Sequence, residues 1–150
     1  MSEPALDRLT PRRRPVHLWV VGVLALLWNT FGAFDYLATQ LRLPFYVDQM
    51  PQALRDHMDA APAWTVAAWA IGVWGAFLGS VGLLLARRWA VWMFGASLVG
   101  LAANTVYNFG LSGTSDSLGN AAVPMTVFIW LVAIALFAYA LRQRQRGLLR

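Results

Sequence analysis

The sequence contains no cysteine and no lysine, and only 13% of its 150 residues are charged. Without cysteine, disulfides, iron–sulfur clusters and thiolate-ligated zinc are excluded. A typical soluble domain is about 25% charged and about 45–50% apolar, whereas 59% of this chain is hydrophobic. A soluble fold of this length has too little interior to hide so much apolar surface. The composition therefore predicts a membrane protein whose main partner is the lipid bilayer.

Apolar runs long enough to cross a bilayer occur four times. About 20 mostly apolar residues span the hydrocarbon core as a helix, which also satisfies its own backbone hydrogen bonds. The four predicted spans are residues 16–38, 63–86, 89–110 and 121–141. We therefore expect an all-α polytopic membrane protein, a single membrane domain over residues 1–150 with four transmembrane helices in an antiparallel bundle. Residues 1–15 and 142–150 form its two tails.

All 12 basic residues are arginines, and their placement predicts the orientation of the chain. Ten of them flank the predicted spans on one side of the membrane, and only Arg42 and Arg55 lie on the other. By the positive-inside rule the arginine-rich side faces the cytoplasm, so both termini are expected there. Because the arginines flank apolar runs and form no separate basic domain, the net charge of +5 does not indicate nucleic-acid binding.

The first loop on the opposite side carries the segment MPQALRDHMDAAP, residues 50–62. Met50, Leu54 and Met58 recur at intervals of four, which gives a helix one apolar stripe, and Pro51 suits the first turn of a helix. One interpretation is a short interfacial helix that lies on the outer leaflet. The other is a lid packed over the bundle.

Small residues mark the second and third predicted spans. Gly72, Gly75 and Gly79 lie on the second span and Gly100 on the third. Such residues let helix backbones approach closely in lipid. Packing within one four-helix bundle is the favoured interpretation. The alternative is an interface with a second copy of the chain or with a partner membrane protein.

Polar residues cluster in the outer half of the first and third spans. The members of this cluster are Asn29, Asp35, Tyr36, Asn104, Tyr107 and Asn108. If both helices start at the cytoplasmic edge and rise 1.5 Å per residue, Asn29 lies about 20 Å up and Asn104 about 22 Å up, and Asp35 matches Asn108. Polar groups at membrane depth face the bundle interior or water. Two interpretations stay open: an outward-facing pocket for a small molecule, or hydrogen bonds that only hold helices together.

Few catalytic chemistries fit the sequence. The two histidines are His17, at one membrane edge, and His57, in the loop on the other side, so they do not share a haem or another metal. No nucleophile, base and orienting residue occur together, and no Gly-rich phosphate loop is present. We therefore expect no enzymatic activity, no catalytic residue, no metal site and no cofactor.

Four stretches carry a resemblance to a known group of proteins. They are WNTFGAFDYLATQLR (28–42), PAWTVAAWAIGVWGAFLGS (62–80), RRWAVWMFGASLVG (87–100) and VYNFGLS (106–112). They resemble small, uncharacterised four-helix proteins of the bacterial inner membrane that are often labelled sugar transporters. The resemblance implies the same fold, the same membrane and a link with transport. With the polar cluster, it predicts a transport-associated protein with an outward-facing pocket; the alternative is an accessory or scaffold subunit of a larger membrane complex.

Overall fold

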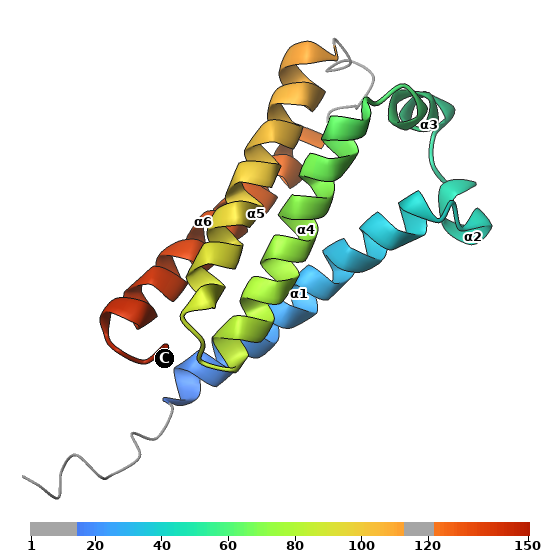
Figure 1. Ribbon diagram of the computed structural model, residues 1–150. Helices are drawn as coiled ribbons and strands as arrows, with labels where there is room; N and C mark the ends of the chain where they lie inside the picture. Colours follow the sequence, from blue (N-terminus) through green and yellow to red (C-terminus); the bar gives the residue numbers. More distant parts are fainter. Residues whose placement is uncertain (1–14, 113–121) are drawn as a thin grey trace, which may run out of the picture.

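Helices make up the described part of this protein. The computed structural model describes residues 15–112 and 122–150, so most of the predicted N-terminal tail, and the first residue of the fourth predicted span, lie outside the described residues. The elements, shown in Figure 1, are α1 (Val16–Gln40), α2 (Pro44–Val47), α3 (Gln52–Asp59), α4 (Ala63–Leu84), α5 (Trp89–Val106), η2 (Tyr107–Leu111) and α6 (Ala122–Gln145). No strand occurs within these two ranges.

Four helical segments are long and apolar enough to cross a membrane: α1, α4, α6, and α5 together with η2. This confirms the predicted all-α class and its four apolar segments. The bounds differ by a few residues, since α1 continues to Gln40 and α6 to Gln145. The short helix α2 has no counterpart among the predicted elements. Pro44 stands at its start, where the missing N–H of proline costs no hydrogen bond.

The closest helix pair is formed by α4 and α5. The four glycines singled out in the sequence lie on this contact: Gly72, Gly75, Gly79 and Gly100. A Cβ atom built on Gly75 would lie 2.9 Å from Met93 O, and one on Gly100 would lie 2.5 Å from Ala68 O. Only glycine lets the two backbones come this close. The small-residue face of α4 is therefore occupied by α5 of the same chain.

The end of the molecule that holds the α4–α5 turn, called the turn end, contains the main apolar core. Leu18 of α1, Leu83 of α4 and Phe94 of α5 are almost fully buried there. The chain beyond α6 folds back over this end, with Leu149 buried and a hydrogen bond of 2.7 Å from the last backbone N–H, at residue 150, to the carbonyl oxygen of residue 86. The C-terminal residues thus add a further segment to the core, to which Ala140 of α6 also contributes.

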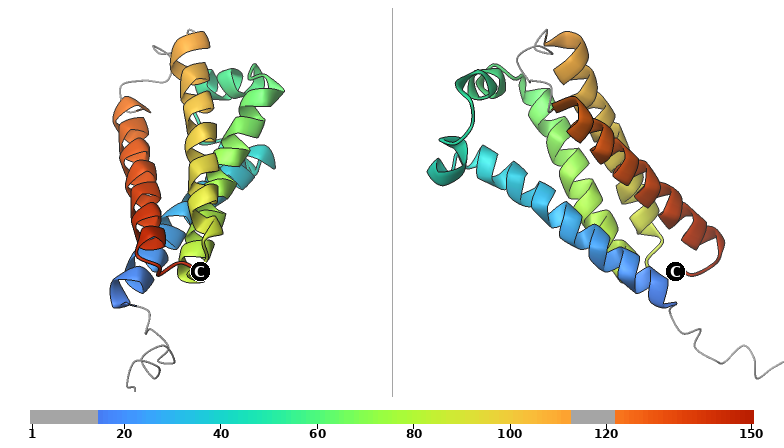
Figure 2. Two further views of the ribbon diagram at one scale, coloured as in Figure 1. Left: turned by 60° about the vertical axis from the view of Figure 1, so that its left-hand side comes forward. Right: turned by 180° about the vertical axis from the view of Figure 1, so that it is seen from behind.

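At the opposite end, called the loop end because it carries α2 and α3, the helices separate. Figures 1 and 2 show α1 crossing α4 at an angle and moving away from it toward α2. α1 packs on α4 and α6 packs on α5, but α1 and α6 hardly approach each other. The contacts that bridge this α1–α6 seam include two aromatic pairs: His17 Nδ1 lies 2.7 Å from Tyr139 OH, and the rings of Trp28 and Phe128 are 5.3 Å apart.

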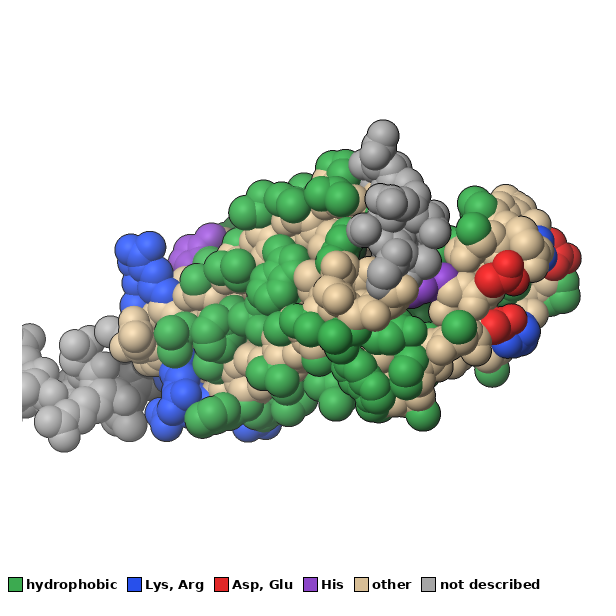
Figure 3. Space-filling view, turned by 90° about the horizontal axis from the view of Figure 1, so that it is seen from above, with side chains coloured by type: hydrophobic (Ala, Val, Ile, Leu, Met, Phe, Trp, Pro, Cys, Tyr) green, Lys and Arg blue, Asp and Glu red, His purple; other side chains and the backbone are tan. Residues whose placement is uncertain are grey.

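The surface of the long helices is apolar. Figure 3 shows hydrophobic side chains over the middle of the molecule, arginines near the turn end, and aspartates together with arginine at the loop end. Leu27, Leu131 and Ile134 are among the large side chains that are half exposed or more. An exposed apolar belt of this extent indicates a lipid bilayer as the surrounding medium.

We expect Gly100→Ala to destabilise the protein, because the added methyl group meets the backbone of α4. Overpacking of this kind costs about 1–3 kcal/mol. Gly95→Ala on the same helix is the matched control, since the nearest atom to its new Cβ is Phe137 Cε2 at 3.5 Å. Thermal unfolding in detergent, followed by circular dichroism, measures both variants. Equal midpoints for the two would contradict the close α4–α5 contact.

Candidate functional site

A cavity of about 440 Å³ lies between α1, α4, α5 and α6, and is called the main cavity. Its wall is mostly apolar and includes Val73 of α4, Leu101 of α5 and Ile129 of α6. Most of its polar lining residues, among them Asp35 and Asn104, lie toward the loop end. A volume of about 300–1,000 Å³, an apolar lining and a few convergent polar groups are typical of sites for small ligands.

A second cavity of about 250 Å³ lies under α3 and is called the vestibule. The stripe of Met50, Leu54 and Met58 lines it, so this face of α3 is turned toward the long helices. Four residues line both cavities and form what we call the neck: Asp35, Trp69, Asn104 and Asn108. The two cavities therefore meet at one carboxylate, two amides and an indole.

A chain of hydrogen bonds fixes the two amides of the neck. Asn108 Nδ2 donates to Asn104 Oδ1 at 2.8 Å, and Asn104 Nδ2 donates to Thr65 O at 3.3 Å. His57 Nε2 lies 3.0 Å from Asn108 Oδ1, a contact that requires the proton on Nε2 because an amide oxygen only accepts. The chain of bonds links α3, η2, α5 and α4, and so ties the roof of the vestibule to the wall of the main cavity.

Asn108 belongs to η2, a π-helical turn that continues α5. Turns of this kind are rare and frequently occur at functional sites. The turn changes the register of the residues that follow Val106, and Asn108 then lines both cavities. The sequence pattern of this segment contains nothing that distinguishes a π turn from ordinary α-helix.

Asp35 reaches the neck from α1 and is half-buried. Its Oδ1 accepts a hydrogen bond from the hydroxyl group of Tyr46. This bond raises the pKa of Tyr46 to about 12, and burial and the negative charge of Asp35 add to the shift. Asp35 Oδ2 has no hydrogen-bond partner within the described ranges. Thr39 Oγ1, one turn further along α1, lines the vestibule side and is buried without a partner.

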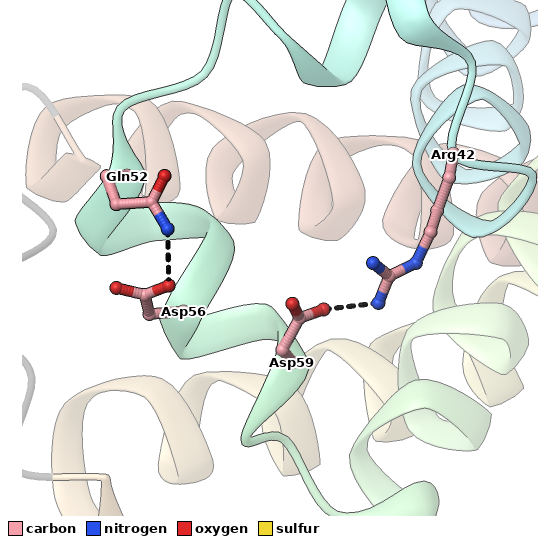
Figure 4. A network of polar contacts seen from close by, with 4 residues as sticks. All are labelled: Arg42, Gln52, Asp56 and Asp59. Carbon is pink, nitrogen blue, oxygen red and sulfur yellow. Dashed lines mark hydrogen bonds and ion pairs between the residues drawn. The ribbon is translucent and has the colours of Figure 1, made fainter.

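Surface contacts hold α3 over the vestibule. Figure 4 shows the ion pair between Arg42, just beyond α1, and Asp59 at the end of α3. It also shows the hydrogen bond of 2.7 Å from Gln52 Nε2 to Asp56 Oδ1 within α3. Both members of the ion pair are largely exposed, so the pair orients α3 but contributes little to stability.

The predicted depth match between Asn29 and Asn104 is wrong. Asn29 Nδ2 donates to Ser80 Oγ at 2.9 Å, whereas Asn104 bonds to Thr65 O. Ser80 and Thr65 are fifteen positions apart on α4, which corresponds to about 22 Å along the helix. The prediction fails because it assumes that α1 and α5 begin at the same depth in the membrane. In the structure Gly22 lies against the last turn of α4, so the beginning of α1 extends beyond that helix.

The structure brings together most of the predicted polar residues. Four of them line the main cavity: Asn29, Asp35, Asn104 and Asn108. Tyr107 lines only the vestibule, and Tyr36 lines neither cavity because its ring packs against Trp69 at a centroid distance of 5.0 Å. Asp35 and Asn108 meet at the neck without bonding to each other, since the partner of Asp35 is Tyr46.

The site residues that are absent from the predicted cluster include the neck residue Trp69 and three polar residues: Thr39, Tyr46 and His57. Tyr46 depends on α2, whose signal in the sequence is limited to Pro44 at its start. His57 precedes Met58 and so borders the apolar stripe of α3. It becomes identifiable once that stripe is assigned to a lid, which is the interpretation that the contacts of α3 favour.

Comparisons of the chain with protein-family models, with curated proteins and with solved structures give no match. The described lining residues supply one carboxylate, one imidazole, amides, hydroxyls and indole rings. Among the residues described, no three of His, Asp and Glu gather closely enough to hold a metal ion. Hydrogen bonding and apolar contact with a small molecule are the chemistry that these groups offer.

We expect Asn29→Ala and Ser80→Ala each to lower stability, and the double variant to lose less than the sum of the two. The shared hydrogen bond is worth on the order of 0.6–2 kcal/mol in a membrane helix pair. Thr30→Ala is the control, because the Thr30 hydroxyl bonds only to the carbonyl oxygen one turn back in its own helix. Reversible unfolding in detergent measures all four variants. Strict additivity would show that the bond contributes nothing.

Proposed function

We propose that this protein is a four-span antiparallel bundle of the bacterial inner membrane that binds a small molecule in the main cavity, as a transport-associated protein. The neck carries this proposal. There, one carboxylate and two amides converge at the junction of an apolar cavity with the vestibule. Polar groups at such a junction are placed to recognise one end of a ligand whose remainder lies among apolar side chains.

Two polar atoms support a ligand over purely structural bonding. Buried polar groups in proteins are nearly always hydrogen-bonded, yet Thr39 Oγ1 is buried and has no partner among the described residues. Asp35 is half-buried, and its Oδ2 accepts no bond from the described residues. Both belong to residues that line the vestibule. A ligand with hydrogen-bond donors would supply the partners that Thr39 Oγ1 and Asp35 Oδ2 lack.

The alternative of a scaffold subunit has lost its main support. It depends on a free small-residue face on the second span, and that face is packed against α5. The lid interpretation of α3 suits a binding protein, because α3 roofs the vestibule and is connected to the neck through His57.

The proposed orientation places the turn end and both termini in the cytoplasm and the vestibule on the outer side. It is supported by the arginines near the turn end and the aspartates at the loop end (Figure 3). In this orientation the vestibule opens away from the cytoplasm, and α3 lies at the outer surface of the membrane.

An outward-accessible cavity predicts that a single cysteine at Gly32 reacts with a membrane-impermeant thiol reagent added to intact spheroplasts. Gly32 lines the main cavity, and a Cβ built there meets no atom within 4 Å, so the variant fits without strain. The chain has no cysteine of its own, so labelling reports on this position alone. Such reagents need a thiolate, and a thiolate needs water.

Thr30→Cys is the matched control for this experiment. Thr30 lies two residues away on the exposed face of α1 and lines neither cavity, so lipid should protect it. The proposal fails if Gly32→Cys stays unlabelled in spheroplasts while the denatured variant reacts, or if the two positions react at equal rates.

The orientation has its own test. Alkaline phosphatase, which is active only outside the cytoplasm, should be inactive when fused after Arg150 and active when fused after Ala61. The reason is the excess of arginine at the turn end. The opposite pattern would reverse the proposed orientation and place the vestibule on the cytoplasmic side.

A further inference from the structure

The charge of the site is one-sided. Among the described residues, Asp35 is the only carboxylate that lines the main cavity or the vestibule, and no described arginine lines either. Arg42, at the end of α1, is engaged in the ion pair with Asp59. The remaining titratable lining groups are His57, which bonds to Asn108, and Tyr107. A ligand with a phosphate, sulfonate or carboxylate group would therefore meet one negative charge and no fixed positive one.

Within the described ranges, no cationic side chain forms an ion pair with the carboxylate of Asp35. Tyr46 donates a hydrogen bond to Oδ1 but brings no positive charge, and Oδ2 is without a partner among the described residues. Charged groups removed from water are normally paired. A cationic group of the ligand would complete the pair. Trp69 lines the same neck, and an indole face is the strongest aromatic partner for a cation.

The rest of the main cavity accepts an elongated apolar group. The lining residues of α5 and η2 run from Phe94 to Phe109, fifteen positions or about 22 Å of helix. Two further lining residues flank the α1–α6 seam: Phe31 is 74% exposed and Met125 is 56% exposed. Side chains that line a cavity and are also this exposed mark a place where the cavity reaches the lipid-facing surface.

We infer that the ligand is a lipophilic cation: an amine or quaternary ammonium group at the Asp35 carboxylate, carried by an apolar chain that fills the main cavity and reaches it through the α1–α6 seam. This inference rests on the proposed function, because it names the chemical class of the molecule bound in the same cavity.

The test uses the Gly32→Cys chain in nanodiscs of neutral lipid and measures how fast the neutral reagent N-ethylmaleimide modifies the thiol. Three probes with the same apolar chain are compared as protectants: decyltrimethylammonium, decyl glucoside and decanesulfonate. Decyltrimethylammonium should protect the thiol at the lowest concentration. In the Asp35→Asn background its half-protecting concentration should rise about 30-fold or more, the effect of removing one partner of a desolvated charge pair. Asp48→Asn, an exposed carboxylate that lines neither cavity, should leave it unchanged.

The outcomes separate this inference from the proposed function. If decyl glucoside or decanesulfonate protects as well as the cation, or Asp35→Asn changes nothing, the cavity binds ligands but the charge preference is overturned. If no probe protects a thiol that is still labelled in spheroplasts, the ligand class is wrong and the accessible cavity stands. If Gly32→Cys never reacts in the folded protein, both fail.

A second pair of variants covers the case in which Asp35→Asn does not fold. Asp35→Glu keeps the charge, and Tyr46→Phe keeps the carboxylate while removing its hydrogen-bond donor. Both should retain protection by decyltrimethylammonium. Loss of that protection in both, with circular dichroism unchanged, would assign the effect to the shape of the neck and overturn the inference.

Discussion

The close contact between the backbones of α4 and α5 is the constraint on which the rest of the structure depends. Glycines such as Gly75 and Gly100 bring the two helices together so tightly that a Cβ atom would meet the opposite backbone. α1 then adds to the free side of α4 and α6 to the free side of α5, and these two outer helices hardly approach each other. The main cavity is the space that this arrangement leaves, so it is a consequence of the tight pair and not a local packing defect.

Polarity within the bundle follows the separation of the helices. At the turn end, where α1, α4 and α5 converge, the interior is apolar around Leu18, Leu83 and Phe94. At the loop end, where α1 has moved away from α4, carboxylate and amide groups line the opening. The hydrogen bonds of Asn104, Asn108 and His57 connect this opening to α3. These bonds couple the roof of the vestibule to the wall of the main cavity.

Much of the architecture could be predicted from the sequence because lipid imposes simple rules. Segment length and apolarity gave the four long helices, and the glycines on α4 lie at the helix contact that small residues favour in membranes. The partners of the polar residues could not be predicted in the same way. Asn29 bonds to Ser80 and lies at a different depth from Asn104. Helix tilt and stagger decide which residues share a depth, and the rise of 1.5 Å per residue gives no information on either. The hydrogen-bond donor to Asp35 could not be predicted, because the position of Tyr46 depends on α2, a helix of only four residues.

By itself, the sequence determined the number of apolar helices, their approximate bounds and the asymmetry of charge between the two ends, since these depend on composition and on distances along one chain. Only the tertiary structure decided that a cavity exists, that Asp35, Trp69, Asn104 and Asn108 meet at its neck, and that α3 covers it. These features arise from the angle at which α1 crosses α4 and from the π turn after α5. Neither the crossing angle nor the π turn can be read from the periodicity of apolar residues within a single segment.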